Sequence, residues 1–205
     1  MQERLKDLYR LQELYLLRAF GQEFVEQKVQ LQEQLQNSSY DDILNCRLCH
    51  RSKMSKPIVG MIHNQSKVSF VTQTPVLNPK GLFLQTRSAQ MLQSIISNVL
   101  HFSLSDCSIF SLLKCGEMFE YAQEVEICKN HLFEQLKTLP NSVILCFLDM
   151  QALETFRLKQ KDLFGKITEW NNQKIIFTHS LKTLSKNPSL KKETMQHLLL
   201  LKENL

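Results

Sequence analysis

Ser142-Val-Ile-Leu-Cys-Phe-Leu148 is the stretch of the chain that decides the fold. It is a continuous apolar run with the length of a strand that is buried on both faces. Such runs are typical of parallel sheets covered by helices on either side. The run is far too short to cross a membrane as a helix.

Expected strands alternate with expected helices on both sides of this run. Apolar patterns predict further strands at Val68–Val71, Ser108–Leu113 and Lys174–Thr178. Helical periodicity predicts helices at Ser88–Leu100, Glu120–Leu136, Gln151–Leu158 and Leu190–Lys202. The alternation predicts an α/β protein, a three-layer α-β-α sandwich around a short central parallel sheet. Ligand sites in such sheets lie at the carboxyl ends of the strands.

Residues 1–45 form a predicted N-terminal helical extension before the α/β domain of residues 46–205. Leucines recur at helical spacing from Leu5 to Leu17, and a helix is expected over residues 2–36. We favour packing of this helix on its own domain, because the repeat is too short for a coiled coil. Self-association or a protein partner is the alternative. The polar, acidic start does not resemble a signal peptide, so a cytoplasmic protein is expected.

Charge is unevenly distributed along the chain, whose net charge is +5. Residues 1–45 carry 5 basic and 8 acidic side chains, whereas residues 46–205 carry 20 basic and 12 acidic ones. A basic body indicates a polyanionic partner such as nucleic acid. A solvated lysine-rich surface is the alternative, and charge alone does not separate the two.

Four of the six cysteines have positions that indicate a metal centre. Cys46 and Cys49 form a C-x-x-C pair, Cys115 closely follows an expected strand, and Cys128 comes 13 residues later. Four thiolates are the ligand set of an iron–sulfur cluster or a structural zinc ion. Spacing alone leaves these two at even odds, with unliganded cysteines close behind. The other two are Cys146, expected in the core, and Cys107, which has no partner spacing.

The order of these features over residues 46–205 resembles the family 4, iron–sulfur uracil-DNA glycosylases. That family has, in order, C-x-x-C, Gly-Glu-Ala-Pro-Gly, Gly-x-Pro-Phe-x-Gly-x-x-Gly-x-x-Leu, Thr-Asn-x-x-Lys-Cys, a fourth Cys, Leu-Gly-x-x-Ala, Gly-Lys-x-x-x-Trp and Thr-x-His-Pro. The corresponding segments of this chain are, in the same order, Cys46–Cys49, Val71–Pro75, Gly81–Leu92, Phe110–Cys115, Cys128, Leu148–Ala152, Gly165–Trp170 and Phe177–Ser180. The order of the motifs is specific, although each motif is individually eroded.

The resemblance implies a uracil-DNA glycosylase-like sandwich, and single-stranded or duplex DNA containing uracil as the partner. It also favours a four-iron, four-sulfur cluster over zinc on the four cysteines. The cluster would brace the domain beside DNA and take no part in bond cleavage. Most of residues 1–45 lie outside the resemblance.

The catalytic groups depart from the family pattern more than the cysteines do. Gln73 stands in place of the water-orienting carboxylate, and an amide can orient water but cannot act as a base. Ser111 replaces the Asn that reads uracil; a hydroxyl also donates and accepts, but it is shorter. His179 is retained, and in the family it donates to the uracil carbonyl. Leu84, with Phe83 beside it, stands where an aromatic side chain stacks on the flipped base.

Two main functions stay open on this evidence. The first is a divergent uracil-DNA glycosylase that uses Gln73, Ser111 and His179. The second is a catalytically inactive relative that keeps the fold and the cluster to bind DNA or a protein; a zinc-stabilised interaction protein is a weaker third. A set of lysines near His179 is predicted to contact phosphates: Lys182, Lys186, Lys191 and Lys192.

Overall fold

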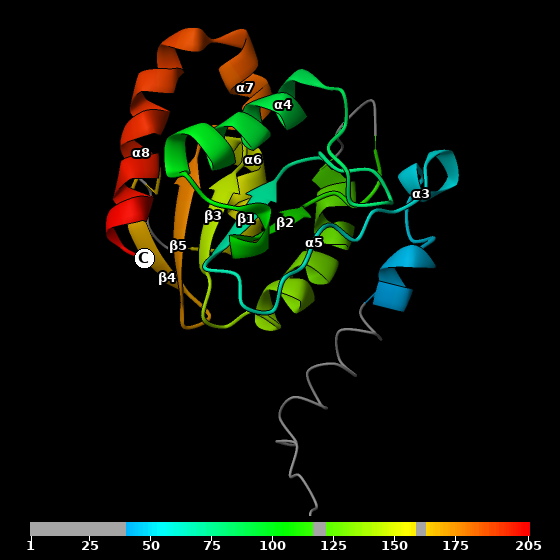
Figure 1. Cartoon of the computed structure of the whole chain (residues 1–205). Helices are drawn as coiled ribbons and strands as arrows, with labels where there is room; N and C mark the ends of the chain where they lie inside the picture. Colours follow the sequence, from blue (N-terminus) through cyan, green and yellow to red (C-terminus); the bar gives the residue numbers. More distant parts are fainter. Residues whose placement is uncertain (1–39, 117–121, 159–162) are drawn as a thin grey trace, which may run out of the picture. The chain divides into compact units, whose positions relative to one another are not determined.

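The computed structural model describes residues 40–116, 122–158 and 163–205 of the chain (Figure 1). The predicted helix over residues 2–36 lies outside these ranges, so its role in packing or self-association stays a prediction. Residues 40–44 are helical, and a short helix, α3 (Arg51–Met54), follows the C-x-x-C pair.

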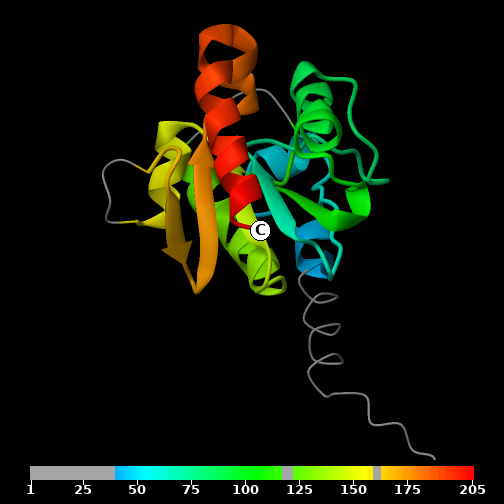
Figure 2. The ribbon, with the colours of Figure 1, turned by 60° about the vertical axis from the view of Figure 1, so that its left-hand side comes forward.

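A five-stranded sheet forms the centre of the described chain. Its strands are β1 (Val68–Thr72), β2 (Cys107–Ser111), β3 (Val143–Phe147), β4 (Ile167–Trp170) and β5 (Gln173–Thr178), in the order β2-β1-β3-β5-β4. The four strands expected from the sequence pair in parallel, which confirms the predicted parallel sheet. The edge strand β4, which was not predicted, runs antiparallel to β5 (Figure 2). A turn of two asparagines with positive φ, Asn171 and Asn172, joins them.

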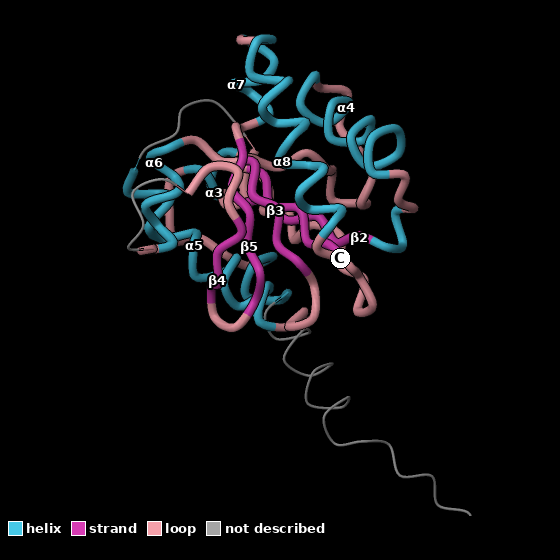
Figure 3. The backbone as a smooth tube through the Cα atoms, turned by 90° about the vertical axis from the view of Figure 1, so that its left-hand side faces the viewer, coloured by secondary structure: helices cyan, strands magenta, loops and turns pink. Residues whose placement is uncertain are grey.

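Helices cover both faces of this sheet, so the predicted three-layer arrangement is confirmed (Figure 3). One face carries α4 (Arg87–Ser94) with its π-helical continuation η1 (Ile95–Leu100), α7 (Leu181–Lys186) and α8 (Lys191–Glu203). The other carries α5 (Ala122–Lys137), α6 (Met150–Leu153) and η3 (Glu154–Phe156). Two short 3-10 turns, η2 (Leu104–Asp106) and η4 (Pro188–Leu190), complete the described elements. None of the described helices is both long and apolar enough to cross a bilayer.

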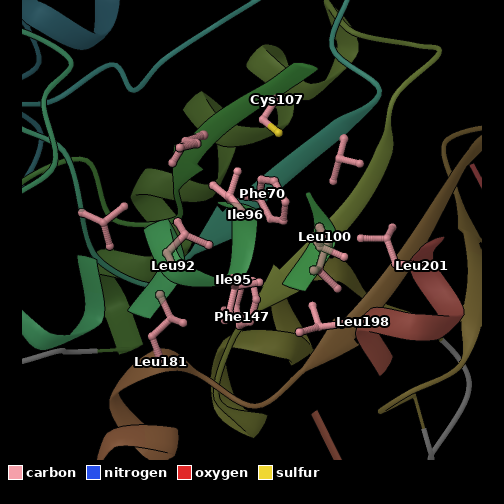
Figure 4. Close-up of a cluster of buried hydrophobic side chains, with 14 of the residues drawn as sticks. Phe70, Leu92, Ile95, Ile96, Leu100, Cys107, Phe147, Leu181, Leu198 and Leu201 are labelled. Carbon is pink, nitrogen blue, oxygen red and sulfur yellow. The ribbon is translucent and has the colours of Figure 1, made fainter. Parts of the chain in front are cut away.

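Alternating side chains of the strands form two apolar cores, one on each face of the sheet. Phe70 and Phe147 pack with Leu92, Leu181 and Leu198 under the helices of the first face (Figure 4). On the second face, the neighbouring strand residues pack against α5 and α6: Val71, Ile144 and Cys146. Cys146 is fully buried there, which confirms its predicted place in the core. Burying each large side chain contributes about 1.5–3 kcal/mol, and these two cores fix the strand ends that carry the candidate site.

Candidate functional site

The residues that follow four parallel strands meet at one edge of the sheet. Thr72, the last residue of β1, is level with Ser111 at the end of β2 and with Phe147 at the end of β3. Phe147 is level in turn with Thr178 at the end of β5. Gln73, Ser111 and His179, the three predicted catalytic residues, therefore lie at the same edge, where ligands of such sheets bind.

Gln73 is half-buried and lies between β1 and the segment that follows β3. Its side-chain Oε1 accepts a hydrogen bond from the backbone N–H of Asp149 at 3.2 Å. Gln73 also lines a cavity of about 20 Å³ together with Thr74, Ser180 and Lys182. A polar cavity of that size takes about one water molecule. Gln73 therefore lines a water-sized cavity, and its role in orienting a water stays a prediction.

Ser111 lies beside a second and smaller cavity. Its side chain is buried, and the cavity of about 10 Å³ is also lined by Gly60, Pro75 and Val76. Gly60 has a φ of +106°, and a Cβ there would lie 2.4 Å from the carbonyl oxygen of Ile109, so this close approach needs glycine. Val76 lines both cavities, which are therefore neighbours.

Phe83 and Leu84, predicted to stack on a flipped base, lie on the segment beyond these cavities. Both are partly buried and pack against the apolar core on the α4 face of the sheet. Neither lines the Gln73 cavity or the Ser111 cavity. Their role toward a base stays a prediction.

His179 follows β5 and lies against the first turn of α8. Its Nε2 is 3.0 Å from Oε2 of Glu193, and its ring stacks on Phe164 with 5.1 Å between ring centroids. A carboxylate only accepts hydrogen bonds, so the neutral imidazole carries its proton on Nε2 and a lone pair on Nδ1. His179 does not line the Gln73 cavity, although its neighbour Ser180 does.

His197 on α8 completes this histidine cluster. Its Nδ1 is 2.9 Å from the hydroxyl of Thr178, and its Nε2 is 3.9 Å from Glu193. Burial lowers the pKa of His197; the charge of Glu193 opposes this shift, and His179 adds to it. Gly165 approaches so closely that a Cβ there would lie 2.2 Å from Nε2 of His197. Sequence reasoning missed Glu193 and His197. They lie at i, i+4 spacing on one side of a predicted helix, which was the available signal.

Asp149 is a second carboxylate that sequence reasoning missed. It occupies the N-cap position of α6, but its side chain caps no N–H group of that helix. Its Oδ1 instead accepts a hydrogen bond from the hydroxyl of Thr183 at 2.9 Å. The hydroxyl of Ser180 donates in turn to Thr183 Oγ1 at 2.9 Å. The available signal was its place just after the apolar run, at the carboxyl end of a strand.

All four lysines that are predicted to contact phosphates are exposed. They lie on α7 and α8, beside these strand ends. Lys182 lies in the first turn of α7 and lines the Gln73 cavity. Lys186 ends α7, and Lys191 and Lys192 begin α8. Their contact with DNA stays a prediction, but their positions place positive charge on the side of the sheet edge that carries His179.

The segment that follows the C-x-x-C pair contacts the loop that carries Cys115, a third predicted metal ligand. Arg51 of α3 is buried and donates to the carbonyl oxygen of Cys115 at 3.1 Å, and Ser55 donates to that of Gly116 at 2.9 Å. Pro57 pairs with Cys115 in an antiparallel bridge. These contacts tie the segment after Cys49 to the loop that carries Cys115.

Electrostatic coupling links all four thiols. Burial, followed in size by the charges of Cys128, Cys49 and Cys46, raises the pKa of Cys115 to about 12. Burial also raises the pKa of Cys128. Four coupled thiols bind together as thiolates only around a positive centre, so the donor set suits a metal or cluster. Within the described ranges, however, no three Cys, His, Asp or Glu side chains stand at ion-holding distances.

Comparison with known proteins gives one result that decides the family. A family model described as the uracil DNA glycosylase superfamily matches residues 59–200, more than two thirds of the chain. The chain belongs to the uracil DNA glycosylase superfamily. A search of curated proteins finds no match. The superfamily match covers the whole sheet edge described above, and it starts after the C-x-x-C pair at Cys46 and Cys49.

Membership of the uracil DNA glycosylase superfamily gives the sheet edge a chemical context. An N-glycosidic bond is cut by placing a water near the sugar and by stabilising the charge that grows on the departing base. The edge offers an amide at Gln73, carboxylates at Asp149 and Glu193, and an imidazole at His179. Its two cavities, of about 20 and 10 Å³, are each too small for a base.

Proposed function

We propose that this protein binds DNA and hydrolyses the N-glycosidic bond of a flipped-out uracil. The observation that carries the proposal is the alignment of four strand ends in a member of the uracil DNA glycosylase superfamily. That alignment gathers a hydrogen-bonding amide, a buried hydroxyl, a carboxylate and an imidazole: Gln73, Ser111, Asp149 and His179. Each has a chemical type that one step of base excision requires.

Three of these groups and a set of lysines have the following proposed roles. Gln73 orients the attacking water, since it lines the water-sized cavity. Ser111 reads the edge of the base, because a hydroxyl can both donate and accept. His179, backed by Glu193 at 3.0 Å, donates a ring N–H to the base carbonyl on which negative charge develops. The lysines of α7 and α8 hold the phosphates.

A second candidate function is a catalytically inactive relative that binds DNA or a protein. It is favoured by the sizes of the two cavities, about 20 and 10 Å³, neither of which holds a base. It is also favoured by Gln73, whose amide cannot take a proton from water. Catalysis thus requires both an opening of the site and another base.

We propose further that the protein belongs to the family 4, iron–sulfur group, with a four-iron, four-sulfur cluster on Cys46, Cys49, Cys115 and Cys128. The support is the electrostatic coupling of the four thiols and the contacts that tie Cys115 to α3. When bound, the cluster would cross-link these segments and leave the hydrolysis to the sheet edge. Zinc on the same thiolates is the alternative.

The excision proposal is tested with single-stranded and duplex oligonucleotides that contain one uracil. Wild-type protein is expected to leave abasic sites, which hot alkali converts to strand breaks, and His179→Ala is expected to leave far fewer. The matched control is His63→Ala, a half-buried histidine beside the second residue of β2, and it should retain the wild-type rate. Wild-type turnover no greater than that of His179→Ala, with retained DNA binding, would favour the inactive relative.

The cluster is tested separately by anaerobic purification followed by analysis for iron, acid-labile sulfide and zinc. About four irons and four sulfides per chain are expected for this cluster type. Zinc without iron or sulfide would refute the cluster and leave the excision proposal untouched.

A further inference from the structure

The hydroxyls of Ser180 and Thr183 connect the Gln73 cavity to the carboxylate of Asp149. Ser180 is 2% exposed and lines the cavity. Its hydroxyl donates to Thr183 Oγ1 at 2.9 Å, and the hydroxyl of Thr183 donates to Asp149 Oδ1 at 2.9 Å. The donors therefore all run in one direction, from the cavity toward the carboxylate.

Helix capping explains only part of this chain of hydrogen bonds. Ser180 is the N-cap of α7 and accepts the backbone N–H of Thr183 at 3.1 Å, which is an ordinary capping contact. Capping does not require the bond from Thr183 to Asp149. Asp149 sits at the N-cap of α6, and its side chain is turned away from that helix toward α7. Asp149, whose residue type favours helix capping, thus accepts a hydrogen bond from Thr183 instead of capping α6.

The cavity end of the chain can accept a proton from a water molecule. A hydroxyl oxygen accepts two hydrogen bonds, and Ser180 uses one for the N–H of Thr183. A water in the cavity would lie beside both Ser180 and Gln73. The amide of Gln73 can orient that water, and the hydroxyl of Ser180 can take its proton.

We propose that Ser180 and Thr183 form a proton relay that lets Asp149 act as the base that Gln73 cannot be. The relay rests on the proposed excision activity. The water oxygen forms a bond to C1′ of the sugar while the C1′–N1 bond breaks, and that electron pair leaves with the uracil anion. The water proton passes to Ser180, the Ser180 proton to Thr183, and the Thr183 proton to Asp149 Oδ1. Thr183 and Asp149 act through Ser180, so both are positioning residues.

The test compares Thr183→Val with Thr183→Ser in the full-length protein. Valine has nearly the same shape without the hydroxyl, whereas serine retains the hydroxyl. Single-turnover excision from a single-stranded uracil oligonucleotide is expected to slow about 100-fold in Thr183→Val, the size of a general-base contribution. Thr183→Ser should restore most of the rate. Ser185→Ala, which removes a hydroxyl that donates only to the Leu181 carbonyl of the same helix, is the matched control and should react like wild type.

The conservative variant separates a relay from a structural role. The DNA affinity of Asp149→Asn and Thr183→Val should stay unchanged while excision slows in both. A wild-type rate in Thr183→Val would overturn the relay alone. Equal losses in Thr183→Val and Thr183→Ser would overturn it in favour of packing. A wild-type protein that forms no abasic product would overturn the excision activity and the relay together.

Discussion

Replacement of Gly165 by alanine tests whether the histidine cluster behind His179 is a fixed part of the fold. Gly165 has a φ of +66°, and an added Cβ would lie 2.2 Å from Nε2 and 2.3 Å from Cδ2 of His197. Gly81 is a matched control, because it has a φ of +76° and a Cβ there would meet nothing within 4 Å. Both substitutions place an alanine in the left-handed backbone conformation, which lowers the free energy of unfolding. Only Gly165→Ala also displaces the ring of His197.

The expected magnitudes follow from these two environments. A left-handed alanine costs about 1–2 kcal/mol, and this should be the whole loss for Gly81→Ala. Moving His197 breaks its 2.9 Å hydrogen bond to Thr178, which is worth about 1 kcal/mol, and disturbs a buried packing contact of similar worth. Gly165→Ala is therefore expected to lower the free energy of unfolding by about 2 kcal/mol more than Gly81→Ala.

Urea denaturation followed by tryptophan fluorescence measures this difference. Trp170 is the single tryptophan of the chain, and it is buried against Phe133 and Phe156. The dependence of the unfolding free energy on urea should be the same for both variants. Equal losses of unfolding free energy in the two variants would show that the His197 ring moves aside without destabilising the fold. The account of Glu193 and His197 as a fixed support for His179 would then be wrong.

Three further predictions concern the cysteines, the surface charge and the pH dependence of stability. The cluster proposal predicts that Cys46→Ala binds no iron and that Cys107→Ala, which replaces a buried strand cysteine, binds iron; metal analysis of the two purified variants checks this. Lys182→Gln should weaken oligonucleotide binding and reduce the slope of log affinity against log salt by about 1, whereas Lys202→Gln, in the last turn of α8, should change neither. Burial lowers the pKa of His197, so the unfolded chain takes up more protons below the ordinary value of about 6.5. The unfolding free energy should thus fall between about pH 7 and about pH 5, and His197→Asn should fall less steeply in urea titrations across that range.

The sequence predicted the layers of this fold because buried parallel strands and long helices leave strong apolar patterns. All four parallel strands lie where Val68–Val71, Ser108–Leu113, Ser142–Leu148 and Lys174–Thr178 placed them. The edge strand β4 was missed because Ile167–Trp170 is short, and only Trp170 in it is fully buried. The six-residue helix α7 was missed for a similar reason, since so short a segment shows little periodicity.

The candidate site was predictable where a motif named it, and unpredictable where tertiary contacts alone create it. Gln73 and His179 were found by the order of motifs. Asp149 gains its role from Thr183, 34 residues away, and Glu193 from His179, 14 residues away. Each pair joins two different elements of the fold, so a local sequence pattern does not reveal the pairing.

The loop between Ser111 and Cys115 bears on how any loss of activity in a cysteine variant should be interpreted. Lys114 is buried, and its Nζ donates to the carbonyl oxygen of Ser111 at 2.8 Å and to Gln135. Gln135 donates to the carbonyl oxygen of Val59 at 2.8 Å, next to the Gly60 that lines the Ser111 cavity.

One buried network thus joins the proposed cluster ligand Cys115 to the residue proposed to read the base. If Cys115 holds a metal as proposed, removal of that metal should loosen this loop and shift Ser111, even when the metal takes no part in bond cleavage. A cysteine variant that loses excision therefore does not assign chemistry to the proposed cluster. Lys114→Met separates the two, because it breaks the network and leaves all four thiols in place. If it binds as much iron as the wild-type protein but loses uracil discrimination, the network of Lys114 positions Ser111 independently of the cluster.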